Sequence, residues 1–580
     1  MPRIGRARWT TALALALLAT PAGAAAQPGT LDPTFSGGMA VVPGAVRTPG
    51  LAARPVALAR QPDGKLVLAG SGFEAGGTFV LVRLNADGSP DTGFGSGGRT
   101  STRVSAIAES DFDPSGAFAV ALQPDGRIVA AGVGTVATDR GARSRLAVAR
   151  YNQDGSLDGS FGSGGVAMTA LADGAASDLQ AEGHALVLQP DGRIVVAGSS
   201  DAPGCGGCGG LARFNPDGTL DGGFGSGGRV QLDTREGDTV FNAAVLEPGG
   251  RIALAGGAGG TQQFLLARYE PSGAPDSSFG GTGTGWRLDE VGTDQATAHG
   301  LALQPDGKLL VGGVAELIPQ GVGRGSCLEC FALARYTASG VLDRSFGRRG
   351  RVVTAVGPAG RAVDAAAYDV AVQPDGKVLA AGGALVSRPA PQAAVLRYSA
   401  RGALDTGWGA NGAARYRLPD RTGDVRPGAF GIALQPDGRA LIGGATPFHG
   451  EGRLFAARLE SGDAPDEARP GLGFVRVQDR QRIRQMLRRG YLCLFGVDEA
   501  ARVECRVSMD SRLLARQVQI GRRGTRTSSR RDDVLLRVKP ARAARRALRG
   551  LRRVRLLVRV SAVDAAGNRS STRQRVTLRR

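Results

Sequence analysis

Short apolar runs alternate with turn residues along most of the chain, and the same arrangement returns at near-regular intervals. Residues 121–132, ALQPDGRIVAAG, show it: two apolar runs flank a Pro-Asp-Gly turn. Runs of this length, punctuated by Pro and Gly, predict β-strands joined by tight turns. The turn core recurs at residues 61–64, 123–126, 189–192, 247–250, 304–307, 373–376 and 435–438, with starts 57 to 69 residues apart.

Each turn core is followed by further strand and turn signals in a fixed order. A strand ending in Arg and an aromatic residue or Leu comes next, as in LAVARY at 146–151. A Gly-containing turn, an LDxxFG segment such as 156–165 and another short strand complete the unit. Four strands of this length cannot bury a core alone, so units must pack against their neighbours, which is typical of β-propeller blades.

The two ends of the repeat array predict a closed ring. The three-strand block occurs seven times between about Pro55 and Leu459, whereas LDxxFG occurs six times between blocks and once before them, at 31–42. We therefore expect the N-terminal strand to become the outer strand of the last blade, which leaves no sheet edge open. The Ala-rich strand before each turn, such as 118–123, should be innermost, because small side chains fit a crowded axis.

These units resemble the delta-60 repeat, a family of bacterial exported proteins assigned to β-propellers. The resemblance rests on ALQPDGKLLVGG, ARYNQDGSLDGSFGSGG and their copies, and covers roughly residues 29–460. It implies the fold and export, and it brings no established activity, cofactor or catalytic residues. The fourth copy departs from the pattern, with Glu247 in place of Gln and Gly249 in place of Asp.

The residues that repeat in every blade favour a structural role. The copy with Gly249 keeps Pro248 and Gly250 but loses the carboxylate, which turn geometry permits and metal ligation does not. Two roles are open to the strand-end Arg residues. One is a ring that binds an anion; the other, which we favour, is pairing with the Asp of LDxxFG or with turn carbonyls. These Arg residues are Arg83, Arg150, Arg213, Arg268, Arg335, Arg397 and Arg458.

Composition separates three regions of the 580-residue chain. Residues 1–26 read as an export signal, with Arg3, Arg6 and Arg8 before a short apolar stretch and a small-residue cleavage site. Of the 72 Lys and Arg and 52 Asp and Glu, 30 and 8 lie in residues 471–580, which leaves 42 and 44 elsewhere. We expect a secreted or wall-associated protein without an integral membrane segment after signal removal, and we identify no cofactor.

Six cysteines in an oxidising compartment favour disulfides. Cys205 and Cys208, and Cys327 and Cys330, form two Cys-x-x-Cys motifs. Joint zinc ligation by these four is the alternative, but their blades are not adjacent, so two local disulfides are favoured. We expect Cys493 and Cys505 to face each other across a hairpin and to form a third candidate disulfide.

Few other residues carry recognisable chemistry. His184 and His299 lie five residues before their turn Gln, a position that other blades fill with Val56, Phe118, Asn242, Tyr368 and Phe430, and His449 lies in a loop. Alternating Glu109, Asp111 and Asp113 can hold Ca²⁺ through oxygen ligands, but the full calcium-loop signature is missing, and a solvated acidic loop is favoured. The loops of variable length on one face, such as 133–145, 314–330 and 354–367, lie where recognition usually occurs, but surface loops also tolerate insertion, so they mark a face rather than a site.

After a linker at 461–473, residues 474–580 change to Arg-rich alternating runs. The expected strands are 491–497, 502–509, 516–521, 533–539, 553–564 and 573–579, with a short helix at 541–551. The alternation and the DAAGN turn at 564–568 resemble bacterial Ig-like or fibronectin-like β-sandwiches. The excess of Arg suits acidic wall polymers, whereas the scarcity of aromatic residues argues against nucleic acid.

The sequence thus predicts an all-β protein: a seven-bladed β-propeller at 27–460, closed by the N-terminal strand, then a small basic β-sandwich. We favour a non-catalytic binding or scaffold protein whose propeller face recognises an extracellular protein or glycan and whose C-terminal domain tethers it. The alternatives are an exported glycan-active hydrolase or lyase with its site on the variable-loop face, and a polyanion binder acting through the C-terminal domain. An enzyme requires two or three non-repeated carboxylates or histidines to converge at the axis.

Overall fold

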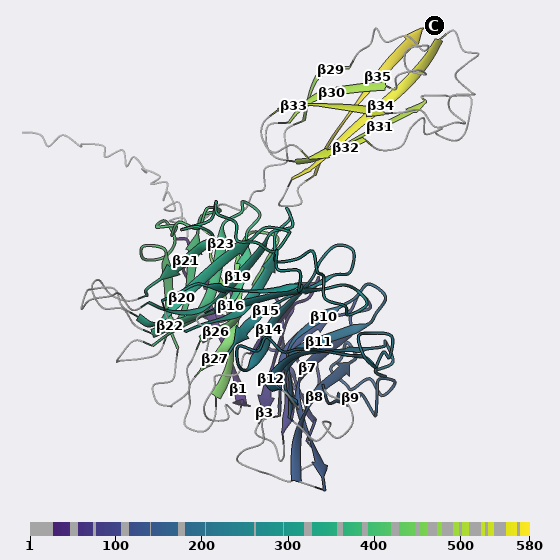
Figure 1. Ribbon diagram of the computed structural model, residues 1–580. Helices are drawn as coiled ribbons and strands as arrows, with labels where there is room; N and C mark the ends of the chain where they lie inside the picture. The colour runs from purple at the N-terminus through teal and green to yellow at the C-terminus, as the bar shows by residue number, and fades with distance from the viewer. Residues whose placement is uncertain are drawn as a thin grey trace, which may run out of the picture.

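Seven four-stranded antiparallel blades surround a common axis in this computed structural model (Figure 1), and two of them are joined into one eight-stranded sheet through β1 (Met39–Val46). It describes residues 27–461 apart from 47–55, 73–76, 106–114, 140, 172–179, 203–204, 260–262, 294, 318–326, 357–363, 386–391, 419–427 and 447–451, and seven strands between residues 472 and 579. Within these residues the elements are strands and one 3₁₀ turn, η1 (Ser36–Gly38). None of the described segments forms a helix long and apolar enough to cross a membrane.

We number the blades one to seven in the order of their innermost strands. The innermost strands are β2 (Ala57–Arg60), β6 (Gly116–Leu122), β10 (Ala181–Leu188), β14 (Thr239–Leu246), β18 (Ala296–Leu303), β22 (Asp364–Val372) and β26 (Gly428–Leu434). The second strands are β3 (Leu66–Gly72), β7 (Ile128–Thr138), β11 (Ile194–Ala202), β15 (Ile252–Ala258), β19 (Leu309–Leu317), β23 (Val378–Leu385) and β27 (Ala440–Thr446). The third strands are β4 (Thr78–Leu84), β8 (Gly141–Tyr151), β12 (Cys205–Phe214), β16 (Gln263–Tyr269), β20 (Cys327–Tyr336), β24 (Gln392–Tyr398) and β28 (Gly452–Leu459). The outermost strands are β5 (Arg99–Arg103), β9 (Val166–Thr169), β13 (Arg229–Leu232), β17 (Trp286–Glu290), β21 (Arg351–Thr354), β25 (Ala413–Arg417) and β1 (Met39–Val46).

The N-terminal strand closes the ring, as the sequence predicts. β1 pairs antiparallel with β28 of blade seven, from Met39 opposite Ala457 to Val42 opposite Leu454. A backbone hydrogen bond of 2.8 Å from Gly29 N to Glu460 O extends this pairing. At its other end β1 meets blade one, where Val46 pairs with Gly72 of β3. The first and last parts of the propeller are therefore joined on both sides of one strand.

The hydrophobic core is divided among the interfaces between neighbouring blades. Each cluster of buried side chains combines residues of two consecutive blades, including the interface between blades seven and one. In that last interface Phe35 from the N-terminal segment packs with Leu68 of blade one and Leu454 of blade seven. Because each blade contacts only its neighbours, removing one interface opens the whole ring.

The repeated Arg forms a latch between blades, which confirms the structural interpretation of the repeat. Its Nε donates to the Asp of LDxxFG at 2.6–3.0 Å, and its Nη1 donates to a turn carbonyl of the following blade. Its guanidinium also lies 4.3–5.3 Å from the centre of the aromatic ring of the same motif. The pairs are Arg83–Asp91, Arg150–Asp158, Arg213–Asp221, Arg268–Asp276, Arg335–Asp343, Arg397–Asp405 and Arg458–Asp32.

The turn Asp side chains accept hydrogen bonds within their own turns, as expected. The carboxylate of Asp63 accepts a hydrogen bond of 3.1 Å from the backbone N–H of Lys65, and Asp125 does the same for Arg127 at 3.0 Å. Gly64 and Gly126 hold φ of 91° and 85°, in the left-handed region that the turn requires. These carboxylates therefore serve turn geometry.

The C-terminal strands form two antiparallel sheets. One has the order β29 (Leu472–Val477), β30 (Tyr491–Val497) and β33 (Asp532–Val538); the other has the order β32 (Gly524–Thr527), β31 (Ala501–Met509), β34 (Arg553–Asp564) and β35 (Arg569–Arg579). The long hairpin of β34 and β35 carries two fully buried side chains, Leu556 and Leu578. The strand expected at 516–521 and the helix expected at 541–551 lie outside the described residues.

The hairpin proposed for Cys493 and Cys505 is wrong, because their strands belong to different sheets. Cys493 in β30 pairs with Val477 and Leu536, while Cys505 in β31 pairs with Gly524 and Val560. Consecutive strands often form hairpins, but here the chain moves to the other sheet, as it does in two-sheet folds. The side chains of both cysteines lie outside the described residues.

Candidate functional site: the axial cavity

One residue near the start of each innermost strand is set apart by a change of register. In blade two Ala117 pairs with Gly132 and Ala119 with Ala131, so Phe118 is an extra residue on the inner strand. The same shift falls at His184, Asn242, His299, Tyr368 and Phe430. Such a β-bulge re-aims the side chain that it carries, and these six side chains line a cavity on the axis.

The repeated Gly of the second strand makes room for each bulge. A Cβ at Gly132 would lie 1.9 Å from the carbonyl oxygen of Gly116, and a Cβ at Gly198 would lie 1.9 Å from that of Glu182. Any larger residue would push the inner strand away. The Gly is thus repeated because the bulge is repeated, whereas the bulged residue itself is free to differ from blade to blade.

The cavity measures about 400 Å³ and is lined by the innermost strands of all seven blades. This volume lies within the usual range for small-molecule sites. Val56 of blade one occupies the place that the bulged residues hold in the other six. Glu182 and Asp369, which do not repeat, also line it. The site is therefore asymmetric on a seven-fold frame.

A hydrogen-bonded chain of polar side chains crosses from blade three to blade five. Glu182 Oε2 lies 3.2 Å from His184 Nε2, and His184 Nδ1 lies 3.2 Å from Asn242 Oδ1. The Asn242 amide is oriented by its Nδ2, which donates to the Ala298 carbonyl at 2.8 Å. Since Asn242 Oδ1 can only accept, His184 Nδ1 is the donor in that contact, and Nε2 faces the Glu182 carboxylate.

Asp369 joins the inner strands of blades six and seven. Its Oδ1 accepts from the backbone N–H of Val370 at 2.8 Å, and its Oδ2 accepts from that of Ile432, on β26, at 2.9 Å. Burial raises the pKa of the Asp369 carboxyl to about 6, although both N–H groups act to lower it. Among the described residues, Asp369 has no ion-pair partner.

His299, on the inner strand of blade five, provides a neutral imidazole to the same cavity. Burial and the nearby His184 lower the pKa of His299 to about 4. Within the described part of the chain, its ring nitrogens make no hydrogen bond, while its ring packs 5.6 Å from that of Tyr368. Its two nitrogens are thus available to a ligand, one as donor and one as acceptor.

Replacing His299 tests this placement through pH. The folded-state pKa of about 4 lies below the ordinary value of 6.5, so the stability that neutral His299 contributes is present above pH 6.5 and is lost as the pH falls toward 4. His299→Phe keeps the ring and removes the proton acceptor. We expect the stability difference between pH 7.5 and pH 5 to shrink by about 1–2 kcal/mol in chemical denaturation. An unchanged pH dependence would contradict burial of this imidazole.

Aromatic rings form the other side of the cavity. The ring centroids of Tyr368 and Phe430 lie 4.7 Å apart, and those of Phe118 and His184 lie 6.2 Å apart, edge to face. Phe118, Phe430 and Val56 are buried, and Tyr368 is half-buried. The cavity thus offers a polar side from blades three to six and an apolar, aromatic side from blades six, seven, one and two.

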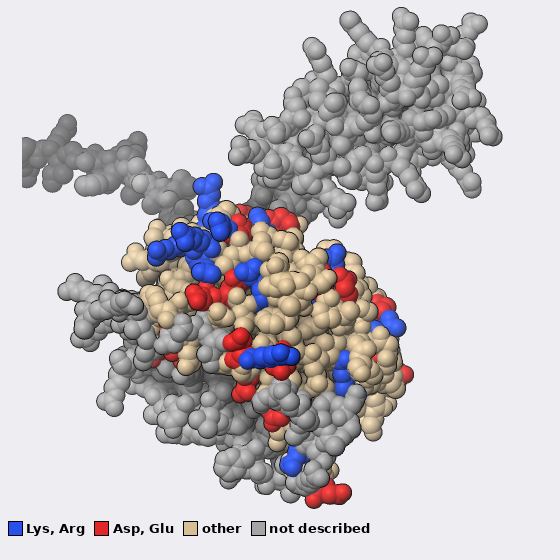
Figure 2. All heavy atoms as spheres, viewed as in Figure 1, with Lys and Arg blue, Asp and Glu red and all other residues tan. Residues whose placement is uncertain are grey.

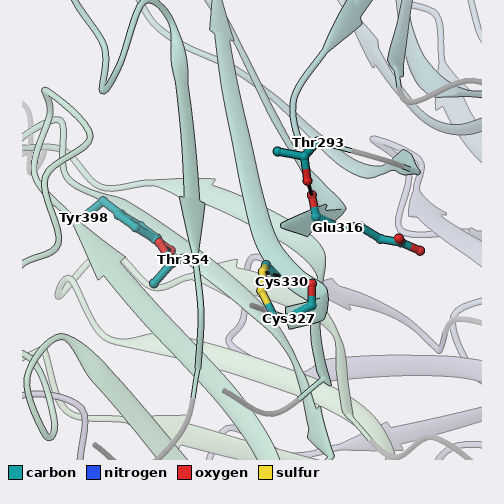
Figure 3. The surroundings of a disulfide bond; sticks show 6 residues. All are labelled: Thr293, Glu316, Cys327, Cys330, Thr354 and Tyr398. Carbon is teal, nitrogen blue, oxygen red and sulfur yellow. Dashed lines mark hydrogen bonds between the residues drawn. A yellow bond between two sulfur atoms is a disulfide. The ribbon is translucent and has the colours of Figure 1, made fainter. Parts of the chain in front are cut away.

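The cysteine motifs have a structural role where they are described. Cys327 and Cys330 form a disulfide at the start of β20 (Figure 3). Around it, the Thr293 hydroxyl donates to the Glu316 carbonyl at 3.3 Å, and the Tyr398 hydroxyl donates to Thr354 at 2.9 Å. Cys208 is also disulfide-bonded. In the described part of the chain no group of three His, Cys, Asp or Glu residues is placed to hold a metal ion.

Several of the expected sites lie outside the residues that the structure describes. Glu109, Asp111, Asp113 and His449 lie outside the described residues, as does the export signal at 1–26. So do parts of the variable loops that we expected to carry recognition. Sequence analysis noted the shared position of His184 and His299 but treated it as a structural slot, and it missed Glu182 and Asp369. The available signal was that one position of an otherwise regular repeat holds five different residue types in seven blades, namely Val, Phe, His, Asn and Tyr.

Fold and cavity define a class of protein: a seven-bladed β-propeller with a ligand-sized space on its axis. Within that class, the chain matches the family model described as "Domain of unknown function (DUF5122) beta-propeller" at residues 61–94, 123–161, 189–224, 248–279, 304–346 and 373–407. No curated protein matches the chain.

Several solved structures are similar to it. A protein of unknown function from Dyadobacter fermentans is 14% identical, with a TM-score of 0.33, over 73% of this chain and 97% of its own. A gluconolactonase from Xanthomonas campestris is 15% identical, with a TM-score of 0.27, over 58% and 90%. An exo-1,5-α-L-arabinanase from a bovine ruminal metagenomic library is 11% identical, with a TM-score of 0.27, over 61% and 97%. Likenesses this distant leave ligand and activity open.

Proposed function

We propose that the protein is an exported binding protein whose propeller holds a small extracellular ligand in the axial cavity. The observation that carries this proposal is the convergence there of polar side chains that do not repeat: Glu182, His184, Asn242, His299 and Asp369. The latch residues repeat in all seven blades, whereas the residues that line the axis differ between blades. The repeated residues therefore hold the fold together, and the varied residues are suited to recognition. The aromatic side supplies apolar contact and the polar side fixes orientation.

Ligand-induced stabilisation tests the proposal. A panel of neutral sugars, small amines and small carboxylates at 10 mM, a concentration about a hundredfold above a Kd of 0.1 mM, stabilises a binding protein by about 2.7 kcal/mol. We expect one class to raise the Tm of the wild-type protein and His299→Phe to reduce that rise. Leu157→Ala, at an exposed turn position, is the matched control and should respond as the wild type does. No rise with any class, or an equal rise in His299→Phe, would count against an axial site.

One observation favours the catalytic alternative, a hydrolase or lyase acting on glycans. The cavity holds a carboxylate–imidazole pair, Glu182 and His184, together with Asp369, whose carboxyl pKa burial raises to about 6. General acid–base chemistry needs groups of this kind. Both Asp369 oxygens accept backbone N–H groups, however, which favours a positioning role. Turnover of fluorogenic arabinosides or glucosides by the wild type but not by Glu182→Gln would establish the enzyme.

The C-terminal region is proposed to tether the propeller to acidic wall polymers. This proposal rests on its excess of 30 Lys and Arg over 8 Asp and Glu. The propeller has no comparable excess, and Figure 2 shows basic and acidic residues side by side on the face in view. The arrangement of the two C-terminal sheets as an Ig-like sandwich belongs to this proposal.

A further inference from the structure

On the face that carries the repeated turns, the junctions from blades one and two to blades five and six share one construction. The turn that holds the Phe-Gly of LDxxFG, here called the FG turn, donates a backbone N–H to the turn after the third strand of the next blade. Between blades two and three, Gly162 N donates to Asp217 O at 2.7 Å. Between blades five and six, Gly347 N donates to Arg401 O at 2.7 Å. Because the backbone is shared, the side chains of these junctions can be compared position by position.

The junction between blades five and six carries four exposed arginines, which we call the junction arginines. Arg344, Arg348 and Arg349 lie in the FG turn of blade five, and Arg401 lies in the facing turn of blade six. Figure 2 shows Lys and Arg gathered over the region where Figure 1 labels β21, the strand that follows this FG turn. At the places of Arg348, Arg349 and Arg401, blades one to three carry Ser (Ser96, Ser163, Ser226), Gly (Gly97, Gly164, Gly227) and Asp (Asp87, Asp154, Asp217). The frame of the ring therefore does not require these arginines.

Arg349 occupies a backbone position that favours glycine. Its φ is 55°, in the left-handed region, where Gly97 and Gly164 of the corresponding turns have φ of 62°. The Cβ of a non-Gly residue is disfavoured at such an angle. A Cβ at Gly97 or Gly164 would meet no heavy atom within 4 Å, so a side chain at this position points into open space. Local packing thus gives no reason for an Arg here, whereas a contact outside the chain does.

The junction arginines are not neutralised by the residues around them. In the part of the chain that the structure describes, their side chains form no ion pair and no hydrogen bond. The two carboxylates of the junction are engaged by the latches, Asp343 by Arg335 at 3.0 Å and Asp405 by Arg397 at 2.8 Å. Residues 335–351 and 397–413, which build the junction, are described without a gap. Four guanidinium groups are therefore available to an anion.

We propose that the junction arginines bind an acidic polysaccharide through its carboxylate or sulfate groups. The planar guanidinium of Arg can donate two parallel N–H groups to either kind of anion. Because two facing turns contribute, one extended polymer chain can reach the arginines of both blades. The inference concerns residues other than those that line the axial cavity, and it goes beyond the function proposed for that cavity.

The surroundings of the junction arginines favour a polysaccharide over other anionic partners. The aromatic side chains of the two turns, Phe346 and Trp408, are fully buried and cannot stack on nucleic-acid bases. Residues 343–350 and 399–412 expose no large apolar side chain, which the core of a protein interface or contact with a membrane would use. A hydrated, charged polymer needs neither.

Chemical modification of arginine in the full-length protein tests the inference at single residues. We expect polygalacturonate or heparin, which carry carboxylates and sulfates, to slow the reaction of phenylglyoxal with Arg348, Arg349 and Arg401 at least about fivefold, because a bound guanidinium is shielded. Mass spectrometry of the peptides measures each residue separately, so arginines of the C-terminal region do not obscure the result. Arg235, an exposed residue of blade three with φ of 61°, is the matched control and should keep its rate. Neutral dextran should protect none of them.

Two variants test whether the turns act together. Arg348→Ser combined with Arg349→Gly installs the residues of blades one to three, so the turn should fold as theirs do, and protection of Arg401 should be lost. Arg401→Ser is the reciprocal variant and should reduce protection of Arg348 and Arg349. Arg235→Gly, which also places glycine at a positive φ, should leave protection of the junction arginines unchanged.

The remaining outcomes overturn the inference. Equal protection of Arg235, or protection of Arg401 that survives in the double variant, would mean that the polymer is not held by this junction. Protection by single-stranded DNA but by neither polysaccharide would assign the surface to nucleic acid. The ligand panel for the axial cavity should raise the Tm of the double variant as it does that of the wild type, so the two proposals can fail separately.

Discussion

Asp32→Ala should destabilise the propeller by about 3–5 kcal/mol, because it leaves buried Arg458 without its partner at the one interface where the ends of the chain meet. Asp32 is 1% exposed, and Arg458 Nε lies 2.6 Å from its carboxylate. Arg439 reaches the same carboxylate. Asp32 also accepts from Thr34 N at 2.8 Å, so the N-terminal segment loses its local turn as well.

Asp437→Ala is the matched control for this prediction. Asp437 lies in the turn of the same blade, pairs with Arg439 at 3.2 Å, and leaves 36% of its side chain exposed, against 1% for Asp32. Removing an exposed ion pair costs less than about 1 kcal/mol. Equilibrium unfolding in urea measures both variants. An equally small loss in the free energy of unfolding for both variants would mean that the N-terminal strand does not hold the ring closed.

Acidification should unfold the propeller between about pH 4 and pH 2. Burial raises the pKa of the latch carboxyls, but hydrogen bonds and the Arg partner outweigh it, so the pKa of Asp32 falls to about 2. The pKa of Asp91, Asp158, Asp221, Asp276 and Asp343 is lowered in the same way. Stability from a lowered carboxyl pKa is present above about pH 4 and is lost as the pH falls through the folded-state value.

The magnitude of this loss is large because the latch is repeated. For Asp32 alone, lowering the pKa from 3.8 to about 2 corresponds to about 2–3 kcal/mol, a sizeable part of the roughly 5–15 kcal/mol that stabilises a domain. The pKa of Asp369 is raised, so protonation of this carboxyl increases the stability of the fold as the pH falls toward 4. The steep loss of stability should therefore lie below pH 4. Circular dichroism across pH 7 to 2 measures it. His299→Phe should show the same transition below pH 4, and a propeller that stays folded at pH 2 would refute the latch account.

The frame of the molecule was predictable from the sequence because its causes are local and repeated. Two features can be recognised in the sequence of each blade: the turn core and the Arg and Asp of the latch. The displaced LDxxFG segment at 31–42 can be recognised at the start of the array. Seven blades and closure by β1 follow from these features. Residues such as Arg83 and Asp91, eight positions apart, meet because one short turn brings them together.

The candidate site was not predictable in the same way. Glu182 and Asp369 lie 187 residues apart in the sequence and line the same cavity only because the ring closes around the axis. The bulge that re-aims His184 and Tyr368 is visible only as a register shift against the second strand. The C-terminal hairpin failed for a related reason: β30 and β31 follow one another in the chain, but each pairs with strands that come later or earlier.

Crystals soaked with the panel compound that raises the Tm most test directly whether a ligand occupies the axial cavity. We expect electron density for that compound between the Tyr368 and Phe430 rings on one side and Glu182, His299 and Asp369 on the other. Density on an outer loop, with the axis left as it is in unsoaked crystals, would contradict it.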